Sequence, residues 1–210
     1  MLLAIAFGIS GSAGVAGDVS TLVFVNKTTA ALGGNVQADG DLNVKAAADS
    51  ELYNIAAAAA ASGSAAVSAV AIVTYFQNET YAFLRSGTNA GTSDAHIGGN
   101  VSILANSRET VDADAAGISG SGAASVGGTL DVIVTQVKTK AYTDSNVNIY
   151  ADGDLKVEAE DDYTLRAIAT SIAGSGTAAV GVTALVSVSF NTINAGLGSG
   201  SVNVNNAEIL

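Results

Sequence analysis

Cysteine, proline and tryptophan are all absent from this chain, and each absence excludes something. Without cysteine there are neither disulfides nor thiol chemistry, and the single histidine, His96, cannot by itself complete a zinc site or a catalytic triad. Without proline, no residue removes a backbone donor from a β-ladder. Aromatic residues make up only 5% of the chain, so the aromatic platforms of a polysaccharide hydrolase or lyase are not expected. We therefore predict no enzymatic activity, and we interpret His96 as a surface residue.

Basic residues are also scarce, with 8 lysines and arginines against 19 acidic residues and a net charge of −11. Nucleic-acid phosphates need clustered basic side chains, so nucleic acid is not an expected partner. No apolar run approaches the ~18–20 residues that cross a bilayer, so we expect no membrane span. Residues 1–8 are apolar like part of an export signal, but no basic residue precedes them and they keep the register of the repeat described next. We expect them to be a strand cut from a longer array.

The chain consists of one sequence unit that is repeated four times. A glycine beside serine and small residues recurs at intervals of 52, 59 and 54, and an alanine landmark at positions 30, 82, 141 and 195 keeps the same intervals. Such self-similarity is typical of stacked units that bury their apolar faces against one another. We treat residues 1–210 as a single repeat array with repeats of approximately 1–38, 39–97, 98–151 and 152–210. The glycine landmarks are Gly11, Gly63, Gly122 and Gly176.

The pattern within each repeat indicates strands. Leu42, Val44 and Ala46 alternate with polar residues, which is the two-residue period of a half-buried strand, and the same segment recurs at 101–105 and 155–159. The sequence predicts an all-β parallel β-helix, or β-solenoid, of four repeats of about 54 residues with this parity facing inward. Two or three coils per repeat would give a rod ~40–55 Å long. Long antiparallel hairpins, closed at Asp39-Gly40 and Asp152-Gly153, are the alternative. Extra residues at 85–95 in the second repeat predict a surface loop.

Three segments together resemble the repeats of very large secreted bacterial β-helical proteins. They are Ala-Asp-Gly-Asp-Leu-Asn-Val-Lys-Ala at 38–46, the alanine-rich arm that reaches Ser-Gly-Ser at 62–64, and Asn-Glu-Thr-Tyr-Ala-Phe-Leu at 78–84. The family is that of the filamentous haemagglutinin-like and leukotoxin-like filamentous adhesins. The resemblance covers the whole chain and implies a non-enzymatic adhesive or structural array, extracellular or on the bacterial cell surface. An otherwise featureless stretch of a carbohydrate-binding or polysaccharide-degrading β-helix is the alternative.

Acidic residues supply the candidate sites. Two Asp-Gly-Asp turns offer the oxygen ligands that calcium prefers, but we interpret them as solvated turn caps and keep calcium as the alternative. An acidic cluster, Glu158, Glu160, Asp161 and Asp162, follows the second turn. The third repeat replaces the motif with Gly-Gly-Asn at 98–100, so we predict no tightly held metal and no cofactor. Glycan-acceptor patterns occur at Asn26, Asn78 and Asn100, and the first two are equivalent repeat positions, so repetition explains them without glycosylation. The calcium candidates are Asp39, Asp41, Asp152 and Asp154.

The alanine-rich arms predict a partner. In residues 54–69 both strand parities carry small apolar groups, and continuous apolar runs are typical of strands buried on two sides. Either a further layer of the same chain covers the outer face, or another copy does. We predict self-association into filaments or bundles, or contact with a host or neighbouring cell surface.

Overall fold

The computed structural model describes all 210 residues, and strands account for nearly all of its regular structure. Seven long strands make up most of the molecule, and short strands near one end separate successive pairs of them. The strands are β1 (Leu2–Ser10), β2 (Ala13–Leu32), β3 (Asn35–Val36), β4 (Leu42–Ser62), β5 (Ala65–Leu84), β6 (Asn89–Ala90), β7 (Val101–Ser121), β8 (Ala124–Thr143), β9 (Asn148–Tyr150), β10 (Leu155–Ser175), β11 (Ala178–Gly196), β12 (Val202–Asn203) and β13 (Ala207–Ile209).

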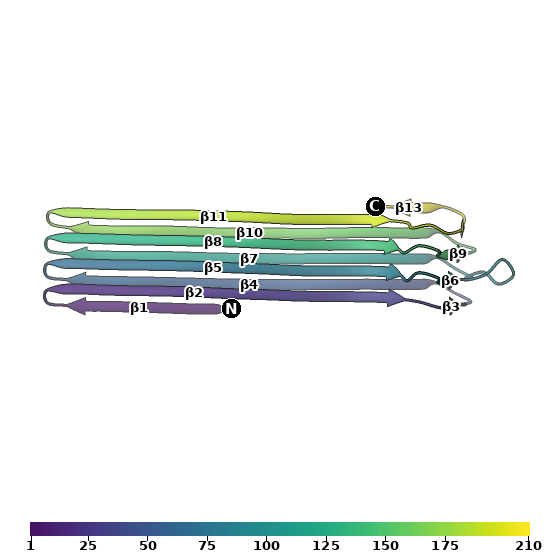
Figure 1. Cartoon of the computed structure of the whole chain (residues 1–210), viewed down its shortest axis with the longest axis horizontal. Helices are drawn as coiled ribbons and strands as arrows, with labels where there is room; N and C mark the ends of the chain where they lie inside the picture. Colours follow the sequence, from purple (N-terminus) through teal and green to yellow (C-terminus); the bar gives the residue numbers. More distant parts are fainter.

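These strands form three sheets in which every pairing is parallel. Sheet A has the order β1-β4-β7-β10-β13, sheet B the order β2-β5-β8-β11, and a short sheet C the order β3-β6-β9-β12. The chain passes from A to B to C and back to A, climbing one strand each time (Figure 1). The predicted parallel β-solenoid is therefore confirmed, and the antiparallel hairpin alternative is wrong.

Each repeat makes one coil, so the expectation of two or three coils was wrong. The reason is strand length: β4 and β7 run for 21 residues and β5 and β8 for 20 without interruption. At ~3.3 Å per residue and ~4.8 Å between strands, the array is a flat slab about 65 Å along its strands and only about 20 Å along the stacking axis. The chain carries no proline that would have broken these strands into shorter ones.

The glycine landmarks lie at the turns between sheets A and B, which line one end of the slab (Figure 1). We call this end the glycine-turn end and the opposite end, which carries sheet C, the short-strand end. In three of these turns the serine before the glycine donates its hydroxyl to the carbonyl three residues on, as Ser10 does to Ala13. The turns stack so closely that a Cβ on Gly63 would lie 2.3 Å from the carbonyl oxygen of Gly11. Stacking therefore requires glycine here.

The inward parity matches the sequence prediction. Val44 and Ala46 are buried, Leu42 is half-buried, and the equivalent residues of β7 and β10 are buried in the same rows. Val157 is fully buried. These residues belong to an aliphatic core of 16 residues at the short-strand end, and a second core of 14 residues lies towards the glycine turns.

The extra residues of the second repeat only partly form a loop. Asn89 and Ala90 are β6, and Thr88 and Ala90 are fully buried. The register offset is 52 residues between β2 and β5, 54 between β3 and β6, and 59 where β4 meets β7. Two extra residues thus precede β6 and five follow it, and the latter form the projection beside β6 in Figure 1. The prediction of a surface loop over all of 85–95 was too broad.

Candidate functional site

The second aspartate of each Asp-Gly-Asp turn lies in a side-chain ladder at the start of sheet A. Asp41 Oδ1 accepts a hydrogen bond from the backbone N–H of Asn100 at 2.7 Å. Asn100 Oδ1 accepts one from the backbone N–H of Asp154 at 2.9 Å, and Asp154 Oδ1 accepts one from Asn206 Nδ2 at 2.9 Å. Carboxylate and amide alternate along the row, so no two negative charges are stacked directly. The oxygens here cap stacked turns, and the asparagine that interrupts the motif keeps the ladder intact.

The first aspartates of the two turns lie apart from this ladder. The Oδ1 of Asp152 lies 2.8 Å from Nδ1 of His96, which comes from the projecting loop. The backbone of Asp39 packs closely against Gly98: a Cβ added to Gly98 would lie 2.3 Å from the carbonyl oxygen of Asp39. No three carboxylate or imidazole side chains converge in a group that could hold a metal ion. The structure thus separates the four calcium candidates: Asp41 and Asp154 cap stacked turns, Asp152 contacts His96, and Asp39 contributes only its backbone.

Strand alternation divides the acidic cluster of β10. Glu158 pairs with Lys156 at 3.0 Å on the outer face, where Glu160 and Asp162 also lie. Asp161 has the opposite parity and points into the slab, in the row of Ser107. What the sequence presents as one acidic cluster is therefore an outer ion-pair surface and one inward carboxyl group.

A polar layer between the two aliphatic cores contains a pair of inward carboxyl groups that sequence reasoning missed. Glu109 is fully buried and accepts a hydrogen bond from Asn78, while Ser107 also donates to it. Burial, followed by a hydrogen bond and repulsion from Glu109, raises the pKa of Asp161 to about 7. The equal spacing of rows in the strands was the only signal that could have placed these acids together.

Another inward acid, Asp131 of β8, lies nearer the glycine turns. It is fully buried and neither carboxylate oxygen has a hydrogen-bond partner. Burial and then the charge of Asp114 raise the pKa of Asp131 to about 6. Asp131 and Asp161 therefore hold a proton to a higher pH than an ordinary aspartate does, and neither lines a cleft where a substrate would bind.

The structure shows what the side chains of Asn78 and Asn100, two of the three asparagines in the glycan-acceptor patterns, contact. Asn78 is fully buried and Asn26 donates to its side-chain oxygen at 2.9 Å. Asn100 belongs to the turn ladder described above. Both side chains form hydrogen bonds to a neighbouring coil.

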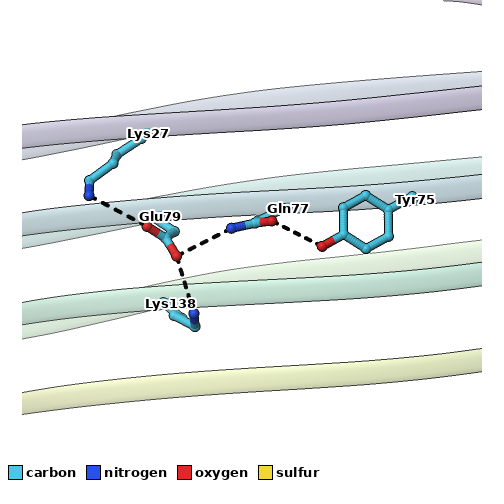
Figure 2. Close-up of polar contacts among 5 residues, drawn as sticks. All are labelled: Lys27, Tyr75, Gln77, Glu79 and Lys138. Atoms are coloured by element: carbon cyan, nitrogen blue, oxygen red, sulfur yellow. Dashed lines mark hydrogen bonds and ion pairs between the residues drawn. The ribbon is translucent and has the colours of Figure 1, made fainter.

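The outer face of sheet B carries a line of charged side chains across its strands (Figure 2). Glu79 bridges two lysines, with Lys27 at 3.7 Å and Lys138 at 3.1 Å, and Gln77 extends the network to Tyr75. Burial of Glu79 opposes its ionisation, but the hydrogen bond and charge of Lys138 outweigh that effect and hold the pKa of Glu79 below its ordinary value. This line separates a polar surface at the short-strand end from an apolar surface at the glycine-turn end.

Beyond the charged line, on the short-strand side, lies a hollow of about 470 Å³. Phe83 stacks on one face of the Tyr142 ring with centroids 4.9 Å apart, and the next residue in that row is Gly196, which has no side chain. One face of the Tyr142 ring is therefore left open towards the hollow, which Lys140 and Asn194 also line. The sequence presents its tyrosines as scattered, and only the coil register reveals this aromatic pair.

Comparison of the chain with known proteins adds no relative to this description. No family model, curated protein or solved structure matches it. No helix in the structure has the length and apolar character needed to cross a membrane. The fold itself defines the class of protein, a flat parallel β-solenoid with one wide coil per repeat.

Proposed function

We propose that this chain is a non-enzymatic structural and adhesive array of a large bacterial surface or secreted protein. The observation that carries the proposal is the exact register of like residues through successive coils: each side chain stacks on its equivalent in the next repeat. Such a slab gains length by adding identical coils, with each coil stabilised mainly by its neighbours. This is the property required of a scaffold that displays surfaces outside a cell.

The resemblance to filamentous adhesin repeats and the acidic composition support an extracellular or cell-surface location. Self-association, or contact with a host or neighbouring cell, is part of the same proposal, because such an array presents wide outer faces. The two carboxyl groups whose pKa is raised to about 6 and about 7, Asp131 and Asp161, point into the space between the sheets.

A direct test is adhesion by the purified chain. Beads coated with the protein should bind to cell surfaces, or to beads coated with the same protein, more than beads coated with a β-solenoid of matched size and charge. Turnover of a polysaccharide or peptide substrate by the purified chain would contradict the non-enzymatic part of the proposal. Equal retention of both kinds of bead would contradict the adhesive part.

The open ring of Tyr142 favours a second function, carbohydrate binding without cleavage. A pyranose ring packs its apolar face on an aromatic ring while amide and ammonium groups at the rim donate to its hydroxyls, and the volume of the hollow fits one or two sugar rings. Tyr142→Ala should abolish retention on immobilised glycans, whereas Tyr53→Ala, on the outer face of sheet A, should leave retention unchanged. Equal retention of both variants would contradict the site.

A further inference from the structure

The outer face of sheet B at the glycine-turn end is apolar across all four strands. Its outward residues form six rows, beginning with the row of Ala13 and ending with the row of Val23. Thr21 and Tyr75 are the only residues in these rows with a polar side-chain atom. The rows are Ala13, Ala65, Ala124, Ala178; Val15, Val67, Val126, Val180; Gly17, Ala69, Gly128, Val182; Val19, Ala71, Leu130, Ala184; Thr21, Val73, Val132, Val186; and Val23, Tyr75, Val134, Val188. We call this surface the valine face.

Exposure of the valine face is not confined to the first and last coils. Val19 in the first coil is 72% exposed, but Val67 and Leu130 in the middle coils are still 40% and 41% exposed. No layer within residues 1–210 covers them, so the alternative of cover by a further layer of the same chain is wrong. The inward positions of the arm are occupied by small buried residues such as Ala58 and Ala60.

The face is large enough to hold a partner. Eleven residues of strand at ~3.3 Å and four strands at ~4.8 Å give about 700 Å². A stable protein–protein interface of standard size buries about 800 Å² on each partner, and contiguous apolar patches of this size are unusual on a monomer. The valine face therefore has roughly the area that a stable dimer needs.

We infer that the valine face docks on the valine face of a second copy of this chain. The inference rests on the proposed structural function and specifies the surface used for self-association. A second copy is the matching occupant because it presents rows with the same ~4.8 Å spacing and equally flat side chains, and stacked sheets pack about 10 Å apart. The interface carries no charged side chain to desolvate.

The charged line of Figure 2 selects the orientation of the two copies. If both copies pointed the same way, Lys27, Lys138 and Lys140 of each would be buried with Glu79 as the only carboxylate in those rows. Burial of excess charge is costly, and these long side chains would hold the sheets apart. The copies therefore run in opposite directions, related by a two-fold axis parallel to the stacking axis, with their short-strand ends projecting on opposite sides.

Full overlap of the six rows then places each row opposite a defined partner row. The row of Gly17 faces the row of Val19, so Gly17 lies opposite Val19 and Gly128 opposite Leu130 of the other copy. Small residues thus face large ones, which is the complementarity that interdigitating sheets require. Ala69 faces Ala71 across the centre of the interface.

The first experiment charges the face. Val73→Lys with Val132→Lys places two lysines in neighbouring positions of one row, and both side chains point outward, so the fold should be kept. Sedimentation of the full chain over a range of concentrations should show a dimer, and the double variant should raise the dissociation midpoint at least about a hundredfold. The matched control, Thr110→Lys with Thr164→Lys, makes the same change in one row of sheet A and should leave the midpoint unchanged.

The second experiment tests the orientation. The chain has no cysteine, so Ala69→Cys and Ala71→Cys proteins can be mixed and treated with a short bismaleimide. The mixture should cross-link severalfold faster than a mixture of Ala69→Cys with Gly128→Cys, the pair that the same-direction arrangement would bring together. Faster cross-linking of the second mixture would overturn the orientation.

Other outcomes overturn the docking itself. A chain that remains monomeric at millimolar concentration has no such interface, and a monomer that sediments with phosphatidylcholine vesicles uses the valine face for lipid. If the lysine double variant is monomeric, the interface is confirmed. If that monomeric variant still adheres to cells, the proposed adhesive function also stands. Adhesion by a wild-type monomer would retain the function and refute this inference.

Discussion

The two halves of the slab solve the packing problem in opposite ways. At the short-strand end the interior holds leucine, isoleucine and valine and the outer faces carry charges. Next to the glycine turns the inward rows of both sheets are mostly alanine, glycine and serine and the valines of sheet B point outward, whereas larger inward residues such as Ile72 occur further from the turns. The valines 182, 186 and 188 of β11 lie outside, whereas Thr183 and Ser187 lie in the inward rows.

The cause is the distance between the sheets. A turn with only two residues between β4 and β5 joins sheets A and B at one end, whereas sheet C separates them at the other. Near the turns the backbones approach so closely that a Cβ on Gly14 would lie 2.5 Å from the carbonyl oxygen of Ala61. Only small side chains fit in the inward rows next to the turns, so the valines there take the other parity. In those rows the hydrophobic parity therefore identifies the outer face, whereas at the short-strand end it identifies the interior.

The largest expected effect is at the short-strand end. Val157→Asp should place an unpaired carboxylate in the aliphatic core and lower the free energy of unfolding by more than about 4 kcal/mol. Urea unfolding followed by circular dichroism measures this change. Ser102→Asp, outward beside Lys156, is the control and should change stability by less than about 0.5 kcal/mol. Similar losses in both variants would show that Val157 is not enclosed.

The next prediction tests the stacking of the turns. Gly63→Ala should destabilise the protein by about 2 kcal/mol, because the new Cβ meets the carbonyl of Gly11 in the coil below. Gly11→Ala, at the same turn position with no atom within 4 Å of its Cβ, should be close to neutral in the same thermal unfolding assay. Equal effects of the two changes would assign the cost to the turn conformation and not to stacking.

The inward carboxyl groups predict a pH dependence. The pKa of Asp161 rises from 3.8 to about 7 in the folded protein. Between these values the native state holds a proton that the unfolded chain has lost, so its contribution makes stability fall as the pH rises from about 4 to about 7. Asp161→Asn should remove this fall and raise stability at pH 8 by about 1 kcal/mol, given that the site is partly exposed.

Urea unfolding of both proteins at pH 4 and pH 8 measures this difference. The gain should disappear near pH 4, where Asp161 is protonated in both states. Asp162→Asn, one residue away on the outer face near Arg108, is the control and should show no such gain. An Asp161→Asn protein that is less stable than wild type at pH 8 would contradict the raised pKa.

The smallest effect is expected on the valine face. Val126→Thr keeps the β-branched shape of an outward side chain that is 45% exposed, so the stability of the monomer should change by less than about 0.5 kcal/mol. Val44→Thr in the short-strand core should cost about 1–2 kcal/mol in the same urea titration, because its hydroxyl would be buried. A larger loss from Val126→Thr would mean that the outer face is covered within the monomer.

Much of the fold could be predicted from the sequence. The intervals of 52, 59 and 54 became the strand registers, and the alternation at 42–46 placed Val44 inward. The number of coils per repeat could not be predicted, because alternation alone does not say how long a strand continues before the chain turns. The glycine landmarks were the turns themselves, and reading them as such would have given one coil per repeat.

The candidate sites were less predictable. The Asp-Gly-Asp turns were correctly located at coil corners, but their hydrogen bonds run to the next coil, 54 or 59 residues away. The pairing of Asp161 with Glu109 and the stacking of Phe83 on Tyr142 likewise join residues of different coils. Neither pair lies within a single repeat, so no local sequence motif predicts these two contacts.

The sequence alone determined the repeat, the strand type, the inward rows of the short-strand half and the acidic surface, because each follows from local alternation or from composition. The tertiary structure decided that each repeat forms one wide coil, that acids from different coils share the interior, and that the valines near the glycine turns lie outside. The physical reason is the separation between the two sheets, which sets the side-chain volume each row accepts and is fixed only when the chain closes its coil.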